Sequence, residues 1–324
     1  MKSTNSIKRA LICGISGQDG AYLARLLLNK GYVVHGSARD AQISNFHNLK
    51  ILGIKDHITF HSMALNDFRS VLQVLVNVKP HEIYNLAGQS SVGLSFEQPV
   101  ETLESITLGT LNLLEAIRFT GGRSKLYSAG SSECFGNTDH QPADEESPFK
   151  PRSPYAVSKA AAFWEVSNYR DSYGLFACTG VLFNHESPLR PDRFVTRKIV
   201  NAASRIAAGS IEKLHLGNIK ISRDWGSAEE YVTAMWLMLQ QSTPEDFCIA
   251  TGETNTLQDF VAAVFEIYKL DWSQHVIVDP LLIRPSEIMV SRANPAKASN
   301  ILHWQAKIKM KKLIDLLVVN KNKI

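Results

Sequence analysis

The stretch Ala10-Leu-Ile-Cys-Gly14-Ile-Ser-Gly17-Gln-Asp-Gly20-Ala-Tyr-Leu-Ala decides the fold. A short apolar run ends at the first of three evenly spaced glycines, and a helical pattern follows at once. A strand that turns into a helix through glycines lets backbone amides and the helix N-terminus approach a pyrophosphate. The stretch therefore predicts the first strand-to-helix step of a dinucleotide-binding domain. Its expected cofactor-binding residues are Gly14, Gly17, Gln18, Asp19 and Gly20.

Outward from this stretch, short apolar runs alternate with helical patterns. Residues 21–30 carry leucines at helical positions and stop at Gly31, a residue that suits the position after a helix end. Such alternation is typical of a parallel sheet wrapped by helices. The runs predicted as strands are Ala10–Gly14, Val33–Gly36, Ile58–His61, Ile83–Ala87, Leu126–Ala129 and Ala177–Phe183. We expect an α/β fold, a doubly wound parallel (Rossmann) sheet with a smaller C-terminal α/β substrate domain.

The length of 324 residues exceeds the usual size of a single core. We therefore predict a nucleotide-binding Rossmann domain over residues 1–179, with its sheet completed by parts of 226–255. Residues 180–324 are expected to form mainly the domain that binds the substrate.

Composition excludes several classes of protein. A hydrophobic share of 44% and a charged share of 20% are those of an ordinary globular chain. The net charge is only +4, and the one dense basic run, 307–312, flanks an apolar stripe of Leu313, Leu316 and Leu317, which favours a solvated helix face over a nucleic-acid surface. The four cysteines are isolated, no histidine pair has metal-ligand spacing, and no apolar run approaches the ~18 residues of a membrane span. We expect a cytoplasmic protein with no metal, membrane or nucleic-acid partner.

Tyr155 and Lys159 lie four residues apart in Ser-Pro-Tyr-Ala-Val-Ser-Lys. On a helix this spacing puts both side chains on one face, where the ammonium group favours the ionised phenol. Ser153 and Pro154 suit the first positions of that helix. A nicotinamide enzyme that oxidises an alcohol needs such a base for the hydroxyl proton. Glu133, in Ser-Ser-Glu-Cys-Phe-Gly, would then be free to handle a second proton.

The end of the second predicted strand distinguishes the two nicotinamide cofactors. An acidic side chain there binds the ribose of NAD, and a cation there accommodates the 2′-phosphate of NADP. Ala38 stands at the acidic position and Arg39 follows it, which favours NADP with Arg39 on the phosphate. The neighbouring Asp40 leaves NAD as the less favoured alternative.

The segment Asn85-Leu-Ala-Gly-Gln-Ser-Ser-Val follows the fourth predicted strand. Its small residues permit close approach of the backbone to a cofactor at the carboxyl edge of the sheet. A plain strand end accounts for the same residues equally well.

Longer motifs resemble one family within the extended short-chain dehydrogenase/reductase superfamily. These are Gly-Gln-Asp-Gly-Ala-Tyr-Leu-Ala, Ser-Ser-Glu-Cys-Phe-Gly, Phe-Asn-His-Glu-Ser-Pro-Leu-Arg, Phe-Val-Thr-Arg-Lys-Ile, Arg-Asp-Trp-Gly and Asn-Pro-Ala-Lys-Ala. They are similar to the motifs of the GDP-mannose 4,6-dehydratases, and the resemblance runs from about Lys8 to Leu316.

The resemblance implies an internal redox cycle on a GDP-sugar. Tyr155, assisted by Lys159, would take the proton of the C4 hydroxyl while hydride passes to NADP, and the ketone would acidify the C5 proton. Glu133 would remove that proton and help the C6 hydroxyl leave as water, after which the hydride returns to C6. Ser131, where the family usually has threonine, would hydrogen-bond the C4 oxygen.

The resemblance also implies binding residues. Those for the cofactor, beyond the glycine turn, Arg39, Tyr155 and Lys159, are Leu65, Leu86, Ala87, Gln89, Ser90, His185 and Arg190. Those for the GDP-sugar are Ser90, Ser132, Glu133, Asn184, Lys198, Arg223, Arg284 and Glu287, with Lys198 and Arg223 on the diphosphate. Arg193, Arg197 and Glu186 are interpreted as surface ion pairs.

Three departures from the family pattern bear on these expectations. The usual paired arginines after the second strand are Arg39-Asp40 here, and the loop that follows is shorter. In relatives that loop reaches a neighbouring subunit, so a homodimer and a homotetramer both stay open. An aspartate that usually contacts adenine is replaced by Ala64. Together these changes leave a GDP-heptose as an alternative substrate.

Two further alternatives use the same fold. A GDP-4-keto-sugar reductase or epimerase would need the Tyr155 and Lys159 pair but no base for C5 proton loss, so Glu133 favours a dehydratase over both. An NADP-binding sensor without chemistry would need none of the three residues, and all three are present.

Overall fold

The computed structural model describes residues 7–320 and divides into two compact units. The first unit comprises Met1–Ser131, Ser153–Val181 and Val232–Phe247. The second unit comprises Ser132–Arg152, Leu182–Tyr231 and Cys248–Ile324. The chain therefore passes from one unit to the other several times.

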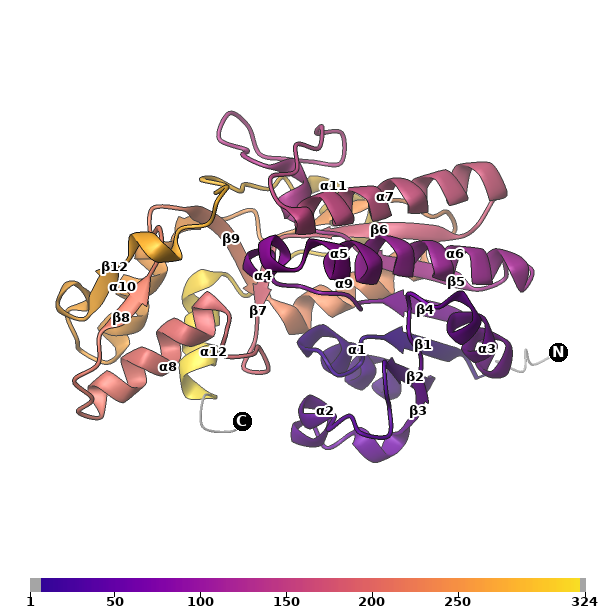
Figure 1. The fold of residues 1–324 in the computed structure, drawn as a ribbon, viewed down its shortest axis with the longest axis horizontal. Helices are drawn as coiled ribbons and strands as arrows, with labels where there is room; N and C mark the ends of the chain where they lie inside the picture. The colour runs from indigo at the N-terminus through magenta and orange to yellow at the C-terminus, as the bar shows by residue number, and fades with distance from the viewer. Residues whose placement is uncertain (1–6, 321–324) are drawn as a thin grey trace. The chain divides into compact units, whose positions relative to one another are not determined.

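A seven-stranded sheet with the order β10-β6-β5-β4-β1-β2-β3 forms the framework of the first unit (Figure 1). Its strands are β1 (Arg9–Cys13), β2 (Val33–Ala38), β3 (Ile58–Ser62), β4 (Glu82–Asn85), β5 (Lys125–Ala129), β6 (Ala177–Leu182) and β10 (Phe247–Ile249). All neighbouring pairs from β3 to β6 are parallel. The doubly wound parallel fold is confirmed, and the six predicted strands agree with the observed ones to within two residues at each end.

The strand order changes direction between β1 and β4. In open parallel sheets, ligands bind outside the carboxyl ends of the strands at such a switch point. The glycine turn after β1 and the loop after β4 both lie there. A cofactor site is therefore expected at this edge of the sheet.

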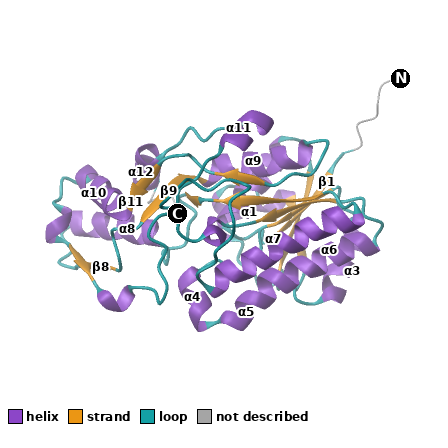
Figure 2. Ribbon diagram, turned by 90° about the horizontal axis from the view of Figure 1, so that it is seen from above, coloured by secondary structure: helices purple, strands orange, loops and turns teal. Residues whose placement is uncertain are grey.

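Helices cover both faces of the sheet. Figure 2 shows α3 (Phe68–Val78), α6 (Gly109–Phe119) and α7 (Pro154–Tyr173) side by side on one face. They bury a core whose members include Leu11, Val71, Ile83, Leu113 and Leu126. Figure 1 places α1 (Gln18–Asn29) and α9 (Ala228–Gln240) on the opposite face. The remaining helices up to α7 are α2 (His47–Ile51), α4 (Val92–Glu97), α5 (Pro99–Leu103), the π-turn η2 (Glu104–Leu108), and the 3-10 turns η1 (Lys55–His57) and η3 (Ser132–Phe135).

The second unit has two small sheets, with the orders β11-β9-β7 and β12-β8. Their strands are β7 (Asn184–Glu186), β8 (Leu214–Leu216), β9 (Ser222–Ser227), β11 (Thr254–Thr256) and β12 (Val276–Val278). The helices are α8 (Val195–Ala207), α10 (Leu257–Ile267), α11 (Ala296–Leu302) and α12 (Met310–Val319), with the 3-10 turns η4 (Trp272–Gln274) and η5 (Pro280–Leu282). Helices α8, α10 and α12 pack around a core that includes Trp225, Phe260 and Phe265.

The C-terminal basic run differs in part from its prediction. Lysines at 307, 309, 311 and 312 are exposed, but the helix begins only at Met310. Leu313 and Leu317 are buried, whereas Leu316 is 38% exposed. Ile314 takes its place in the apolar stripe because residues spaced by three or four share a helix face. Within residues 7–320, no helix is long and apolar enough to cross a membrane.

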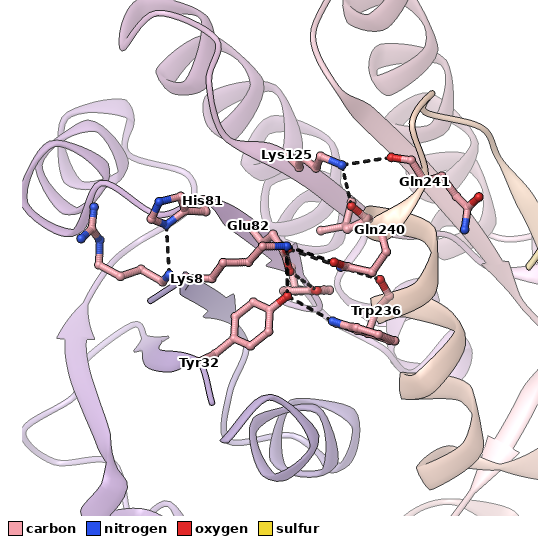
Figure 3. Close-up of polar contacts among 11 residues, drawn as sticks. Lys8, Tyr32, His81, Glu82, Lys125, Trp236, Gln240 and Gln241 are labelled. Carbon is pink, nitrogen blue, oxygen red and sulfur yellow. Dashed lines mark hydrogen bonds and ion pairs between the residues drawn. The ribbon is translucent and has the colours of Figure 1, made fainter. Parts of the chain in front are cut away.

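A buried carboxylate ties the amino ends of the central strands to α9 (Figure 3). Glu82, at the start of β4, is 1% exposed. Its oxygens accept hydrogen bonds from Lys8 Nζ at 3.0 Å, Tyr32 Oη at 3.0 Å, Tyr84 Oη at 2.7 Å and Gln240 Nε2 at 3.3 Å. A buried charge is tolerated only with such partners. Glu82 therefore holds together segments that are far apart in the sequence.

Replacing this carboxylate should be costly. We expect Glu82→Ala to lower the free energy of unfolding by about 2–4 kcal/mol, because it leaves a buried tyrosine hydroxyl and other donors without their acceptor. Lys8→Met should lower it by less than about 1 kcal/mol, because the lysine is half exposed. Urea denaturation of both variants measures the difference. Equal losses in the two variants would contradict the assignment of Glu82 as the centre of the network.

Candidate active site

The turn after β1 is shaped so closely that only glycine fits at its two ends. Gly14 has a φ of 80°, and a Cβ on it would lie 2.9 Å from the backbone of Ala87. A Cβ on Gly20 would lie 2.5 Å from the carbonyl oxygen of Gly14. Helix α1 begins at Gln18, and its N-cap, Gly17, has no side chain to cover the first amides. A turn of this kind fits a pyrophosphate, because the backbone N–H groups at the uncovered N-terminus of the helix can bind its oxygens.

Arg39, just after β2, is exposed and pairs with Glu101 of α5 at 2.9 Å. The neighbouring Asp40 uses its carboxylate within its own loop, where Oδ1 accepts the N–H of Gln42 at 2.8 Å. The cation at this strand end is thus held by an exposed, displaceable partner, whereas the carboxylate stabilises a turn.

The loop after β4 packs against the glycine turn. Leu86 N–H donates to the carbonyl of Cys13 at 3.1 Å, so the loop continues the alignment of β4 beside β1. Gln89 is held by its backbone and side chain, whereas Ser90 is exposed. The structure thus brings the loop residues predicted to bind the cofactor to the edge of the sheet that carries the glycines.

Leu65 lies in the segment that follows the third strand, β3, and packs against α6. Its carbonyl accepts the side-chain N–H of Asn112 at 2.7 Å, and its Cβ lies so close to α6 that a Cβ on Gly109 would come within 3.1 Å. Ala64 donates its N–H to the Ser70 hydroxyl at 3.1 Å. Since alanine has no side-chain acceptor, Ala64 can offer an adenine only backbone contacts.

Helix α7 places Tyr155 and Lys159 as the sequence predicts. Ser153 is the N-cap, its hydroxyl accepts the N–H of Ala156 at 3.1 Å, and Pro154 opens the helix. Lys159 Nζ donates to the carbonyl of Ala129, the last residue of β5, at 2.7 Å. The same ammonium lies 5.9 Å from the centroid of the Tyr155 ring. A cation fixed beside a phenol stabilises the phenolate, so this pair can act as a general base.

The chain leaves β5 through Gly130 and reaches Ser131, which is buried. Gly130 N–H donates to the carbonyl of Gly180 at 2.8 Å, and a Cβ on Gly130 would lie 2.7 Å from Thr179 Cγ2. The strand end therefore has no room to shift. Ser131 is held at a defined position directly after the strand whose last carbonyl binds Lys159.

In the second unit, a buried arginine dominates the electrostatics. Arg223 of β9 is 4% exposed, and its Nη1 donates to the carbonyl of Ser222 at 2.9 Å. Its Nη2 lies 3.9 Å from Glu287 Oε1 and has no hydrogen-bond partner. Arg284 also approaches that carboxylate, at 3.7 Å. Arg223 and Arg284 thus both lie near the Glu287 carboxylate, at the long distances of 3.9 and 3.7 Å.

Burial lowers the pKa of Arg223, and the charge of Glu133 acts in the opposite direction. Glu133 follows the buried Ser132 in η3, so its carboxylate lies within the field of Arg223 in the same unit. An arginine with a buried, unused donor calls for an anion, and a diphosphate is the chemistry that it matches best. Glu133, Arg223, Arg284 and Glu287 are therefore brought together.

The other predicted residues of the second unit lie on β7, on the loop that follows and on α8. His185 Nδ1 contacts the carbonyl of Phe183 at 2.8 Å, and its ring stacks on Tyr231 with centroids 4.8 Å apart. Asn184 precedes it on β7, paired with Trp225 of β9. Lys198 Nζ donates to the carbonyl of His215 at 2.7 Å. Lys198 is exposed, so a phosphate could replace this single backbone contact.

Two of the three residues interpreted as surface ion pairs are not on the surface. Glu186 and Arg197 are each 4% exposed, and only Arg193 is exposed as expected. Glu186 accepts a hydrogen bond from the Thr196 hydroxyl at 2.8 Å and pairs with Arg190 at 3.3 Å. The surface interpretation is wrong for these two because the amphipathic α8 buries the side of its first turn that carries Thr196 and Arg197.

Arg197 does form an ion pair, with Nε 3.9 Å from Asp192 Oδ1, but its guanidinium group is buried. Its Nε and Nη1 are buried without a hydrogen-bond partner, and burial lowers its pKa. The sequence signal for this burial was its place at the start of an amphipathic helix, one residue before Lys198. Glu101 was missed by sequence reasoning, since nothing in the sequence links it to Arg39 across 62 residues. Among residues 7–320, no group of three or more His, Cys, Asp or Glu side chains could hold a metal ion.

The doubly wound sheet, the glycine turn and the Tyr155 and Lys159 helix define the class, an extended short-chain dehydrogenase/reductase. The family model for GDP-mannose 4,6 dehydratase matches residues 11–317. GDP-mannose 4,6 dehydratase 1 of Arabidopsis thaliana is 47% identical over 321 residues, which cover 96% of this chain and 89% of the relative. GDP-mannose 4,6-dehydratase of Sinorhizobium fredii is 43% identical, with 92% of each chain covered.

A solved structure of UDP-glucose 4-epimerase from Thermus thermophilus, in complex with NAD, superposes with a TM-score of 0.85 at 28% identity, over 97% of this chain and 99% of that one. The particular family follows from the match over nearly the whole length. The chain belongs to the GDP-mannose 4,6-dehydratase family.

Proposed function

We propose that this chain is a nicotinamide-dependent GDP-mannose 4,6-dehydratase, which converts GDP-mannose to GDP-4-keto-6-deoxymannose with loss of water. The observation that carries the proposal is the family match over residues 11–317 together with relatives of that name at up to 47% identity. The first unit would hold the cofactor on the glycine turn, and the second would hold the GDP-sugar.

The first unit supplies the groups for oxidation at C4. Tyr155 accepts the proton of the C4 hydroxyl, and Lys159, held by the Ala129 carbonyl, keeps the phenol ready to accept it. Ser131 donates a hydrogen bond to the C4 oxygen and holds it in place. A nicotinamide cofactor held on the glycine turn would supply the hydride chemistry that no side chain can.

Glu133 supplies the elimination. The carbonyl at C4 acidifies the C5 proton, which Glu133 removes, and the same carboxyl group then protonates the leaving C6 hydroxyl. The C5–H and C6–O bonds break, and one water leaves. When hydride returns to C6, the proton that Tyr155 took from the C4 hydroxyl balances the one that C5 regains. The sugar is oxidised at C4 and reduced at C6, so the reaction consumes no external reductant.

The second unit anchors the nucleotide. Arg223 and Lys198 bind the diphosphate, and Arg284 and Glu287 bind ribose and phosphate. The unused Nη2 of Arg223 supports this, because a phosphate oxygen would satisfy a donor that is otherwise buried without a partner. Asn184 contacts the sugar nucleotide.

The decisive test is mass spectrometry of GDP-mannose incubated with the purified protein and no added reductant. We expect loss of one water, and we expect Glu133→Gln to lower kcat by about 10²–10⁴-fold, because a positioned acid–base group contributes that much. Glu146→Gln is the matched control, since Glu146 is an exposed carboxylate of the same unit.

Other outcomes of this assay point to the alternatives. Turnover of GDP-manno-heptose but not of GDP-mannose would identify a GDP-heptose as the substrate. A product of unchanged mass, or a product that forms only with added NADPH and survives Glu133→Gln, would replace the dehydratase by an epimerase or a reductase. NADP binding without turnover of any GDP-sugar would favour the alternative of an NADP-binding sensor.

We propose NADP rather than NAD as the cofactor, with Arg39 on the 2′-phosphate. Glu101 would have to release Arg39, and an exposed ion pair is weak enough to do so. We expect Arg39→Ala to weaken NADP binding by about tenfold and to leave NAD binding unchanged. We expect Glu101→Gln to strengthen NADP binding by up to about fivefold.

Fluorescence titration with each cofactor measures both changes. The matched control is Lys55→Ala, a half-buried cation of η1, which precedes β3. Equal effects of Arg39→Ala on NADP and NAD would contradict the role of Arg39 on the phosphate.

We further propose that the protein is a homo-oligomer, at least a dimer, through the outer sides of α5, η2 and α7. These neighbouring helices expose an unusual number of large apolar side chains, among them Trp164 at 61%. Exposed apolar surface of this kind is typical of interfaces. The other exposed members are Val100, Leu103, Leu108 and Val157.

Sedimentation velocity at micromolar concentration tests this proposal. We expect a dimer or larger assembly, and we expect Trp164→Glu to shift it towards monomer because it buries a charge in the interface. Phe119→Glu is the control, since Phe119 is an exposed aromatic at the end of α6. A monomeric wild-type protein, or equal effects of the two variants, would contradict the proposal that this surface is the subunit interface.

We place the protein in the cytoplasm. Its four cysteines are isolated in the sequence and all buried, a pattern that fits a reducing compartment. Cell fractionation with an antibody to the chain tests this location directly.

A further inference from the structure

A π-turn interrupts the helix that runs beside the loop after β4. Residues Glu104–Leu108 form η2, between α5 and α6, and the flanking residues Leu103 and Gly109 keep right-handed helical backbone angles. The helix is therefore continuous, but one of its turns is wider than the rest. Wide turns of this kind are rare and are frequently found at functional sites. The sequence alone did not predict this π-turn.

The residues around the wide turn use three hydroxyl groups to hold the end of β4 and its loop. The Ser105 hydroxyl accepts the backbone N–H of Gln89 at 3.2 Å. The Thr102 hydroxyl accepts the side-chain N–H of Gln89, also at 3.2 Å. The Thr110 hydroxyl accepts the side-chain N–H of Asn85 at 3.2 Å. Thr102 and Thr110 are buried, so these contacts are shielded from water.

The extra residue explains how one helix reaches both ends of this segment. Thr102 and Thr110 are eight residues apart, which in an uninterrupted α-helix leaves them about 80° apart around the axis. A π-turn absorbs about one additional residue, so the spacing becomes equivalent to seven, or nearly two full turns, and the angle falls to about 20°. Both threonines then face β4 and its loop.

The same turn also contacts the helix of the proposed base. The Thr107 hydroxyl donates to the carbonyl of Ser158 in α7 at 3.1 Å. Ser158 lies between Tyr155 and Lys159 in the sequence. On the loop side the packing is close, because a Cβ on Gly88 would lie 2.9 Å from Ile106 Cγ1. The π-turn thus contacts the loop through one side and α7 through another.

We propose that η2, together with the end of α5, is a positioning element. Thr102 of α5 and Ser105 of η2 hold Gln89 of the cofactor loop, while Thr107 of η2 holds the turn of α7 that carries Tyr155 and Lys159. This inference rests on the proposed function for the roles of the loop and the base. The three side chains touch neither the cofactor nor the sugar in this assignment. They keep the loop and the base in a constant relation, and small displacements of such groups cost large factors in rate.

The first experiment removes the hydroxyls that hold the loop. In Thr102→Val and Ser105→Ala, we expect faster hydrogen exchange at the Gln89 amide and its loop, about tenfold weaker NADP binding and about tenfold lower kcat/KM. Thr102→Ser keeps the hydroxyl and should restore all three. Thr120→Val is the control, since the Thr120 hydroxyl bonds only carbonyls at the far end of α6.

The second experiment removes the contact with α7. We expect Thr107→Val to lower kcat by about tenfold with little change in KM, and Thr107→Ser to restore it. If one element positions both groups, the loss in Ser105→Ala combined with Thr107→Val should differ from the product of the single losses by at least about twofold.

The outcomes separate this inference from the proposed function. Unchanged exchange at Gln89 together with kcat/KM within about twofold of the wild type would overturn the positioning role. Faster exchange throughout the first unit with a lower melting temperature would overturn it as well, because the residues would then be merely structural. If the wild-type protein turns over no GDP-sugar, the proposed function fails, and the exchange and NADP-binding measurements still decide whether η2 holds the loop.

Discussion

The close packing of the turn after β1 against the loop after β4 is the constraint on which the rest of the molecule depends. A Cβ at Gly14 would enter the backbone of Ala87, and one at Gly20 would enter the turn itself. Both neighbours are backbone atoms, so no side-chain movement could make room. The bare N-terminus of α1 and the loop carrying Gln89 consequently meet at the switch point of the sheet, where a dinucleotide binds in folds of this type.

The charged groups follow two different physical rules. On the first unit, Glu82 is buried with four hydrogen-bond donors, and its role is to join segments of the fold. In the second unit, Arg223 is almost as deeply buried, yet its Nη2 has no hydrogen-bond partner and lies 3.9 Å from the Glu287 carboxylate. A satisfied buried charge contributes to structure, whereas an unsatisfied one is tolerated where a ligand completes it. This contrast separates a structural group from a candidate binding group without reference to any relative.

Much of the fold could be predicted because local patterns carry it. The glycine spacing, the leucines of α1 and the Ser153-Pro154 start of α7 each act within a few residues, and the structure confirms those elements. The burial of Glu186 and Arg197 could not be predicted, because it depends on the packing of α8 in the second unit. Leu316 shows the same limit on a smaller scale, since the predicted stripe assumed a helix start that the structure places at Met310.

By itself, the sequence determined six parallel strands of the first unit, the glycine turn, the placing of Tyr155 and Lys159 on one helix, and the family. All of these depend on residues that are neighbours along the chain. Only the tertiary structure decided that Glu101 pairs with Arg39, that Arg223 keeps an unused donor, and that a widened turn of helix faces Gln89 on one side and Ser158 on another. These features join residues far apart in sequence, and a contact across such distances exists only once the chain has folded.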